Sequence, residues 1–382
     1  MKPARLSALV AALFATGGIS SPVLAASPAP EVTRVIERHR LESALTPARD
    51  SPLWRAPRKV LLLQFGNNGW TGQAEAMRSA APGVEIIAAT DRAAALAAAP
   101  DADVIMGFNP EICDPQIIGS AERLRWLASL AAGVENCMDL PTVRKRSVMM
   151  TNMRGIDSPV IAEHAIALLL ALAHGLDRFA LDTNQGVMSR TNAARVPMQF
   201  LEGKTLLVVG LGGIGTEIAQ RASGLGMEVV ATRQGGSGKP EFVRYVGQPD
   251  ELLKLAREAD VVVGALPLTA ETTGIFNAKF FDVLKPNAFF INIARGGSVV
   301  TADLVAALNA GKLAEAGLDV TEPEPLPADH PLWKAPRVLI TPHISARSDL
   351  PGEARWTVAV ENMRRYAAGE PMLSVVDLAR GY

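Results

Sequence analysis

The chain has 382 residues, more than one compact core usually holds, so two domains are expected. Hydrophobic residues make up 48% and charged residues 20% of the sequence, which excludes disordered, collagen-like and coiled-coil proteins. The 38 basic and 39 acidic residues nearly cancel, so no overall positive field for nucleic acid is expected. Only two cysteines are present, which excludes a cysteine-rich zinc or iron–sulfur site, and no metal site is predicted.

The first 25 residues have the order of a secretory signal peptide. Lys2 and Arg5 precede an apolar run at 6–15, no acidic residue is present, and 23–25 is a typical cleavage site. The apolar run is about half the length that crosses a bilayer, so a permanent anchor is not expected. The alternatives are a start codon assigned too early or a buried N-terminal helix. We therefore expect a periplasmic or secreted protein if the signal is used, and a cytoplasmic one otherwise.

Export also matters for the two cysteines, Cys113 and Cys137. They could pair in an oxidising compartment, but the sequence does not show whether their geometry permits a disulfide. Two separate buried thiols are the favoured interpretation.

The remaining chain contains two series of alternating strand and helix patterns. After an N-terminal extension at 26–56, with a helix expected in the charged stretch 31–49, apolar runs occur at 60–65, 84–88, 104–108, 124–129 and 148–151. The second series has six runs, at 205–210, 228–232, 261–265, 288–293, 316–320 and 338–341. Such alternation predicts an α/β fold with two doubly wound parallel sheets, each buried on both faces.

The predicted boundaries follow from these two series. A flavodoxin-like substrate domain comprises residues 57–157 and 346–382, because the terminal segment is expected to pack back on the first unit. Residues 158–345 form the predicted NAD(P)-binding Rossmann domain. That domain opens with a helix at 158–176, where Ser158 can cap the N-terminus and Pro159 suits the first turn. The helix is apolar around most of its circumference, so it must be buried between domains or between subunits.

A glycine motif follows the first strand of the second series. Gly210, Gly212 and Gly215 form G-x-G-x-x-G between an apolar strand and a helix. The three glycines permit a tight turn, close approach of a pyrophosphate and close packing of the helix on the strand. This arrangement predicts a dinucleotide site.

The residue after the next strand indicates which dinucleotide is bound. An NAD enzyme usually has Asp or Glu there, whereas this chain has Thr232 and Arg233, with Lys239 in the following loop. Cationic donors suit a 2′-phosphate, so NADP is predicted, with NAD possible but less preferred. The alternative is that Arg233 is a solvated surface residue.

Three further motifs have polar side chains at the ends of predicted strands. Arg295 follows the run at 288–293, Glu324 lies in a proline-rich loop, and His343 follows the last strand within Thr-Pro-His-Ile-Ser. Together with the glycine motif, the segment 266–274 and the closing Gly-Tyr, their order resembles the D-isomer-specific 2-hydroxyacid dehydrogenases, in particular those similar to glyoxylate/hydroxypyruvate reductases. The resemblance covers residues 58–382 and is strongest over 203–344.

The resemblance implies an Arg–Glu–His active site. Arg295 would bind the carboxylate and keto oxygen of the substrate, His343 would protonate the developing alkoxide, and Glu324 would orient the imidazole. The implied reaction is hydride transfer between NADP(H) and a small 2-keto or D-2-hydroxy acid such as glyoxylate or hydroxypyruvate. Taken singly, each of these residues has an ordinary structural alternative.

The resemblance also implies the binding residues. Ala132, Gly133 and Val134 would meet the substrate together with Arg295 and His343, although 131–135 reads Ala-Ala-Gly-Val-Glu where the family more often has Gly-Ala-Gly-Val-Asp. Asp319 matches a position near the nicotinamide carboxamide. The predicted cofactor contacts are Gly210, Gly212, Gly213, Ile214, Gly215, Thr232, Arg233, Lys239, Leu266, Pro267, Thr272, Ala294, Arg295, Asp319 and His343.

The sequence also suggests two alternative functions and one assembly. A nucleotide-sensing, catalytically weak binding protein on the same fold is the main alternative, and the intact Arg295, Glu324 and His343 argue against it. A periplasmic solute-binding protein is disfavoured by the glycine motif. In the family the helix corresponding to 158–176 supports dimerisation, so a homodimer is predicted. Of the other histidines, His164 and His174 are expected to be core or interface residues.

Overall fold

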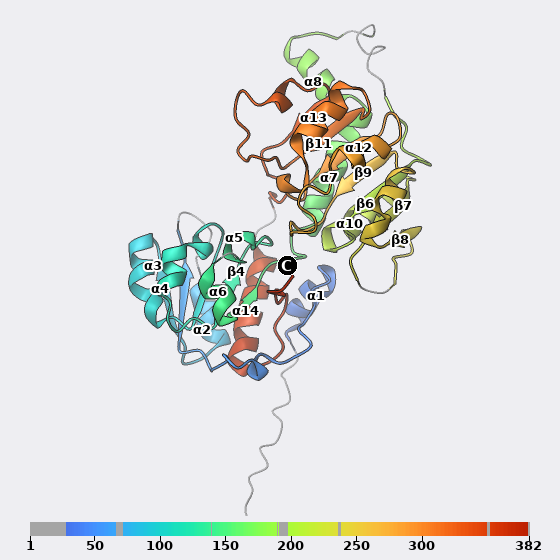
Figure 1. Cartoon of the computed structure of the whole chain (residues 1–382). Helices are drawn as coiled ribbons and strands as arrows, with labels where there is room; N and C mark the ends of the chain where they lie inside the picture. The colour runs from blue at the N-terminus through green and yellow to red at the C-terminus, as the bar shows by residue number, and fades with distance from the viewer. Residues whose placement is uncertain are drawn as a thin grey trace, which may run out of the picture.

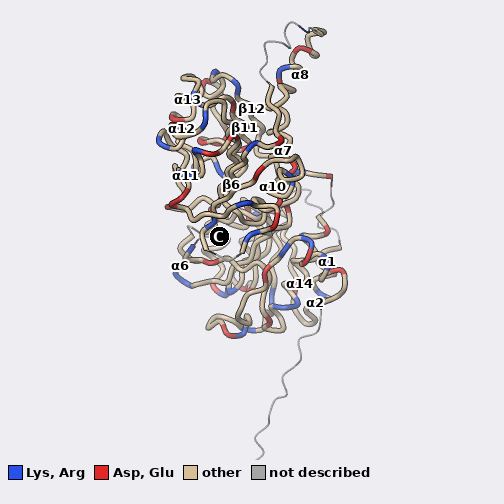
Figure 2. Tube along the Cα trace, turned by 90° about the vertical axis from the view of Figure 1, so that its right-hand side faces the viewer, with Lys and Arg blue, Asp and Glu red and all other residues tan. Residues whose placement is uncertain are grey.

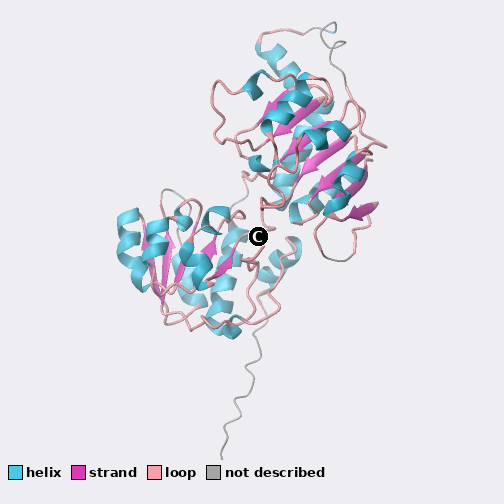
Figure 3. Cartoon of the chain, viewed as in Figure 1, coloured by secondary structure: helices cyan, strands magenta, loops and turns pink. Residues whose placement is uncertain are grey.

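The computed structural model describes residues 28–65, 72–138, 140–188, 190, 198–235, 238–349 and 352–380. The expected signal peptide at 1–25 lies outside these residues. The chain forms two α/β units, each with its strands flanked by helices (Figure 1, Figure 3). Basic and acidic residues are interspersed along both units (Figure 2). The predicted fold class is confirmed.

The first unit contains a five-stranded parallel sheet. Its strands are β1 (Lys59–Leu63), β2 (Glu85–Ala89), β3 (Val104–Gly107), β4 (Trp126–Ser129) and β5 (Met149–Thr151), in the order β2-β1-β3-β4-β5. This is the flavodoxin-like order. The helices of the unit are α2 (Gln73–Ala80), α3 (Arg92–Ala98), α4 (Pro115–Ser120), α5 (Glu135–Met138) and α6 (Pro141–Arg146). Every residue of β3 and β4 is buried, as expected for a sheet covered on both faces.

Both ends of the described chain join this first unit. Helix α14 (Glu353–Ala368) places Tyr366 against Trp126 of β4, with ring centroids 4.9 Å apart. The N–H of Val376 then donates to the carbonyl of Met150 at 2.8 Å. Helix α1 (Pro30–Arg38) packs beside α14 (Figure 1). The helix expected over 31–49 is therefore shorter than predicted, because the chain turns at residues 39–40, where Arg40 has a φ of 50°.

The second unit contains a seven-stranded parallel sheet in the order β12-β11-β10-β9-β6-β7-β8. The strands are β6 (Thr205–Val209), β7 (Glu228–Thr232), β8 (Tyr245–Gly247), β9 (Val261–Gly264), β10 (Phe289–Asn292), β11 (Glu315–Leu318) and β12 (Val338–Ile340). Six of them match the predicted runs, and β8 was not predicted. It is a three-residue edge strand that begins with exposed Tyr245, so it lacks an apolar run. The helices around this sheet include α10 (Gly213–Gly224), α11 (Leu252–Ala256), α12 (Ala278–Val283) and α13 (Thr301–Asn309).

The apolar helix that opens the second unit is α7 (Ser158–Ala173). It ends at Ala173, three residues before the end expected at 176, and α8 (Leu176–Asn184) follows at an angle of 73°. Asp157, and not Ser158, is the N-cap residue, while Pro159 lies in the first turn as predicted. Helix α7 packs against α10, β10 and β11, so much of its apolar surface is buried within one chain. Among the described residues no single helix could cross a membrane by length and composition, and only the bent pair α7 and α8 reaches that threshold together.

Candidate active site

The glycine turn lies between β6 and α10. Gly210 has a φ of 102°, and a side chain there would lie 2.7 Å from the carbonyl oxygen of Ala265. A side chain at Gly215 would overlap the carbonyl oxygen of Gly210, so the helix could not pack so close to the strand. A side chain at Gly212 would meet no atom of the described residues within 4 Å, which leaves this backbone open to a ligand. Gly213 and Ile214 form the first turn of α10, where main-chain N–H groups are free to meet a phosphate.

The end of β7 carries the residues expected near the adenosine ribose. Thr232 is buried, and its carbonyl accepts hydrogen bonds from the N–H groups of Gly210 and Leu211. The Arg233 Nη2 donates to the carbonyl of Gly238 at 2.6 Å, while its buried Nε has no hydrogen-bond partner in the described part of the chain. This orphaned donor fits an anionic ligand. The predicted second cation, Lys239, has its Nζ on the carbonyl of Val243 at 3.0 Å.

The loop after β9 holds three of the other predicted cofactor contacts. Leu266 is buried, and the Thr272 hydroxyl donates to the carbonyl of Pro267 at 2.7 Å. The N–H of Thr269 in turn donates to the Thr272 hydroxyl oxygen at 2.7 Å. These bonds fix a loop at the carboxyl edge of the sheet, where ligands bind in doubly wound folds.

His343 and Glu324 are brought together by the loops that follow β12 and β11. The His343 Nδ1 lies 2.6 Å from the Glu324 Oε1, and the two side chains are 45% and 40% exposed. The second carboxylate oxygen of Glu324 accepts from the N–H of Thr321 at 3.3 Å. The pairing leaves the Nε2 of His343 as the nitrogen available to a substrate.

A buried carboxylate holds the backbone around His343. His343 has a φ of 52°, and its N–H donates to the carbonyl of Asp319 at 2.8 Å. The Asp319 carboxylate accepts from the N–H groups of Ile344 at 3.0 Å and Ser345 at 2.9 Å. Burial alone would raise the pKa of Asp319, but hydrogen bonds from Ser345, Thr341 and Ile344 hold the pKa below its usual value. Asp319 is 1% exposed, so in this structure it anchors the loop that carries His343.

His164 on α7 extends this network, which sequence analysis did not detect. The Thr341 hydroxyl donates to Asp319 Oδ1 at 2.6 Å, and its oxygen lies 2.9 Å from the Nε2 of His164. Because the single hydroxyl proton is directed to Asp319, the Nε2 of His164 must be the donor to Thr341. His164 is therefore a partly buried histidine with a defined tautomer, whereas His174 is exposed at the end of α7.

Arg295 lies at the end of β10 and reaches the first unit. Its Nε lies 3.1 Å from the Glu135 Oε1, and its Nη1 donates to the carbonyl of Ala294 at 2.7 Å. A side chain at Gly133 would overlap the Nη2 of Arg295, so this glycine is what allows the guanidinium to lie against the loop. Arg295 and Glu135 are joined across the two units, which sequence analysis did not predict.

The loop 131–134 has the hydrogen-bonding pattern of an anion site. Its carbonyls are engaged: Ala131 accepts from the N–H of Met153 at 3.1 Å, Ala132 from Asn152 Nδ2 at 2.8 Å and Gly133 from Asn109 Nδ2 at 2.7 Å. Within the described residues, the N–H groups of Ala132, Gly133 and Val134 donate to no protein acceptor. Successive free N–H groups form a concavity suited to a carboxylate.

A disulfide joins Cys113 to Cys137 beside this loop, so the expectation of two separate thiols is wrong. Cys113 ends the short helix Glu111–Cys113 after β3, and Cys137 lies in α5 after β4. Because β3 and β4 are neighbours and parallel, their carboxyl ends meet, and the two Cα atoms lie 4.7 Å apart. The two cysteines are 24 residues apart in the sequence, so their proximity follows only from the pairing of the two strands.

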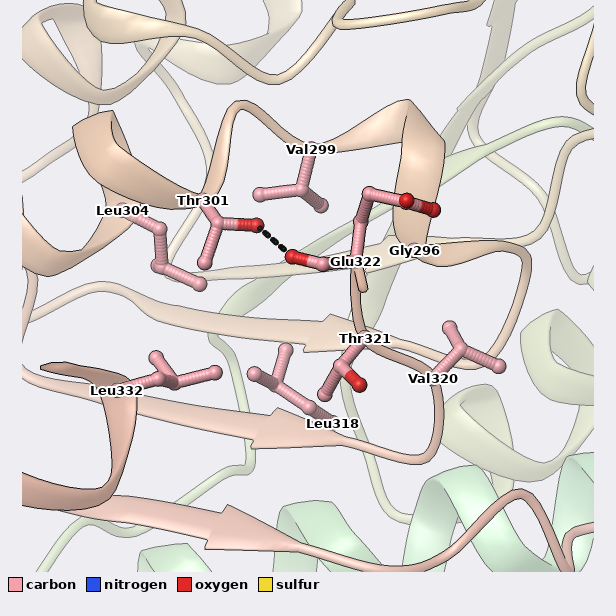
Figure 4. A pocket seen from close by; sticks show the side chains of 9 residues that line it. All are labelled: Gly296, Val299, Thr301, Leu304, Leu318, Val320, Thr321, Glu322 and Leu332. Carbon is pink, nitrogen blue, oxygen red and sulfur yellow. Dashed lines mark hydrogen bonds between the residues drawn. The ribbon is translucent and has the colours of Figure 1, made fainter. Parts of the chain in front are cut away.

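The loops of Arg295 and Glu324 also pack directly on one another. A small cavity of about 10 Å³ lies between them. Figure 4 shows the side chains that line it, among which the Thr301 hydroxyl donates to the carbonyl of Glu322, at 3.0 Å. Gly296 lines this cavity, and a side chain there would overlap the carbonyl oxygen of Thr321. A glycine after Arg295 is therefore needed to keep the two loops in contact.

Known proteins are similar to this chain in sequence and in fold. The sequence model of the D-isomer specific 2-hydroxyacid dehydrogenase NAD binding domain matches residues 166–345. A glyoxylate reductase of Pyrococcus furiosus is 35% identical over 278 residues, covering 71% of this chain and 81% of the relative. The chain belongs to the D-isomer specific 2-hydroxyacid dehydrogenase family.

Two solved structures agree with this family membership. A family protein of Aeromonas salmonicida subsp. salmonicida superposes with a TM-score of 0.72 and 33% identity, over 84% of this chain and 99% of its own. An NADPH-dependent glyoxylate/hydroxypyruvate reductase of Sinorhizobium meliloti, solved with NADP and sulfate, gives a TM-score of 0.71 and 27% identity, over 85% of this chain and all of its own. The protein is thus an NAD(P)-dependent D-2-hydroxyacid dehydrogenase, an oxidoreductase that acts on CH–OH donors and their keto products.

Proposed function

We propose that this dehydrogenase reduces a small 2-keto acid with NADPH, through Arg295, Glu324 and His343. The observation that carries the proposal is the 2.6 Å contact between His343 and Glu324 at the same sheet edge as Arg295. A hydrogen-bonded carboxylate fixes the orientation of the imidazole, as proton transfer from Nε2 to a substrate oxygen requires.

Each residue of the site has a separate role in the proposed reaction. The free N–H groups of Ala132, Gly133 and Val134 bind the carboxylate of the substrate, and the Nη2 of Arg295 adds a charged donor. His343 donates the proton from Nε2 to the keto oxygen while Glu324 holds Nδ1. When bound, the reduced nicotinamide supplies the hydride for the keto carbon. In the oxidative direction the same imidazole accepts the proton.

The cofactor preference is supported by the residues at the end of β7. Arg233 stands where an acid would receive the ribose hydroxyls of NAD, and its buried Nε lacks a partner in the described chain. The glycine turn fits the diphosphate because Gly212 leaves its backbone open. The S. meliloti relative described as NADPH-dependent supports the same preference.

Glyoxylate and hydroxypyruvate are the proposed substrates. The support comes from relatives: the P. furiosus protein is a glyoxylate reductase, and the S. meliloti protein is a glyoxylate/hydroxypyruvate reductase. The alternative of a catalytically weak nucleotide sensor is not favoured, because the His343–Glu324 pair and the anion-binding loop are both intact.

Turnover of the pure protein tests this function. We expect NADPH oxidation with glyoxylate or hydroxypyruvate, and a loss of at least about 100-fold in kcat for His343→Ala, the scale of a lost general acid. Arg295→Lys should also be severe, because a single ammonium cannot reproduce the paired donor geometry. His174→Ala, at an exposed position outside the site, is the control. Near-normal turnover by the His343 or Arg295 variant would contradict the assigned roles.

Export and dimerisation are also proposed. The signal-like residues 1–25 and the disulfide both suit an oxidising compartment, and fractionation with N-terminal sequencing tests this. An intact Met1 end in the cytoplasm would refute export.

Exposed apolar side chains at and beyond α8, including Leu181, Met188 and Phe200, support a homodimer contact. A monomer by light scattering at micromolar concentration would refute it.

A further inference from the structure

We propose that Glu135 is a positioning residue that sets the orientation of the Arg295 guanidinium for the substrate carboxylate. The inference rests on the proposed function, in which Arg295 binds that carboxylate. The observation behind this inference is an ion pair between the two units, in which a distance of 3.1 Å separates the Arg295 Nε from the Glu135 Oε1.

Two of the three guanidinium nitrogens are held by the protein. Nε is bound to Glu135, and Nη1 donates to the carbonyl of Ala294 at 2.7 Å. Together with the covalent attachment of Nε to Cδ, these two contacts fix the plane of the guanidinium. Nη2 has no protein hydrogen-bond partner among the described residues. It lies against Gly133, in the space that a Cβ atom at this position would occupy. The third nitrogen is therefore presented at the loop whose N–H groups are free.

Glu135 is itself held firmly. It is the first residue of α5, between buried Val134 and buried Cys137. The disulfide from Cys137 to Cys113 ties this helix to the segment after β3, and Asn109 fixes the adjoining carbonyl of Gly133 at 2.7 Å. Because these bonds hold its backbone in place, the Glu135 carboxylate can orient a long arginine side chain that comes from the other unit.

The length of the glutamate side chain matters for this contact. An aspartate at the same position would be shorter by one methylene, about 1.5 Å, and would not reach Nε without movement of α5. A glutamine keeps the length and an acceptor oxygen but loses the charge. Three substitutions therefore test separate properties of this side chain. Glu135→Ala removes the contact with Arg295, Glu135→Gln removes only the charge, and Glu135→Asp shortens the side chain.

Binding of oxamate, a carboxylate that is not reduced, gives a test independent of turnover. By calorimetry with the NADPH-loaded enzyme, Glu135→Ala should raise the Kd for oxamate by about tenfold, and Glu135→Gln by no more than about threefold. In steady-state assays Glu135→Ala should raise the KM for the keto acid and leave the KM for NADPH within about twofold, because the nucleotide turn is untouched. Glu122→Gln, an exposed glutamate of the same unit, is the matched control and should leave both constants unchanged.

A double-mutant cycle decides whether Glu135 acts through Arg295. In an Arg295→Ala background, Glu135→Ala should change oxamate affinity by less than about twofold. An equal effect of Glu135→Ala in both backgrounds, or none in the wild type, would overturn the inference while leaving the proposed function standing. If the wild type neither binds oxamate nor reduces any 2-keto acid, the proposed function fails and the inference fails with it.

Discussion

Replacing Arg233 by aspartate should exchange the cofactor preference. The Nη2 of Arg233 is held by the carbonyl of Gly238 at 2.6 Å, which leaves Nη1 and the orphaned Nε, neither with a partner among the described residues, as donors for a 2′-phosphate. A hydrogen bond to a charged group contributes about 1.5–3 kcal/mol, which corresponds to roughly 10- to 150-fold in affinity. Because Arg233 is only half-buried, we take the lower end and expect NADPH to be preferred by about tenfold in kcat/KM.

The assay compares kcat/KM for NADPH and NADH in the wild type and in Arg233→Asp. The aspartate repels a 2′-phosphate and accepts from a ribose hydroxyl, so the variant should favour NADH. Lys239→Ala is the matched comparison: its Nζ is bound to the carbonyl of Val243, and its loss should change the preference by only about twofold. The preference should weaken as salt rises. Equal kcat/KM for the two cofactors in the wild type would refute the reasoning.

Two further predictions concern the loops around the site. Gly296→Ala places a methyl group against the carbonyl of Thr321 and should lower kcat/KM by at least about tenfold. Gly119→Ala, which meets no described atom within 4 Å, should leave the steady-state constants unchanged. Asp319→Asn should lower stability by about 1–3 kcal/mol at pH 7 in thermal denaturation. Because the folded-state pKa of Asp319 lies below its unfolded value, its contribution is present above the unfolded pKa of about 3.9 and is lost as pH falls through the folded value, so the variant should show a flatter acid limb. An unchanged acid limb would contradict this.

Apolar runs were enough to predict eleven of the strands, because buried parallel strands need continuous hydrophobic sequence. The edge strand β8 was missed because only Gly247, its last residue, is buried, so burial imposed almost no pattern on it. Helix α7 was predicted in type and start but not in length, since Leu176 continues the apolar composition while Gly175, with a φ of 62°, breaks the helix.

Some residues of the candidate site could likewise be predicted from the sequence, and others could not. Arg295, Glu324 and His343 could be selected because their motifs follow predicted strands in an order that resembles a known family. The pair of Glu135 with Arg295 could not, because it joins segments 160 residues apart that belong to different units. The same holds for His164 and Thr341, whose contact spans 177 residues. Such partners depend on how the two sheets and α7 are assembled, and no local spacing encodes that.

The redox state of the Cys113–Cys137 pair can report the compartment in which the chain folded. Both sulfur-bearing residues are buried, at 6% and 0% exposure, so a bridge once closed is shielded from casual reduction during purification. Alkylation of freshly lysed cells, followed by mass measurement, would then sort the molecules into two populations by the number of thiols that react after unfolding. A chain folded in a reducing compartment carries two labels and an exported chain carries none. The relative abundance of the two species therefore reports how much of the protein is exported, without a tag, an antibody or an assay of activity.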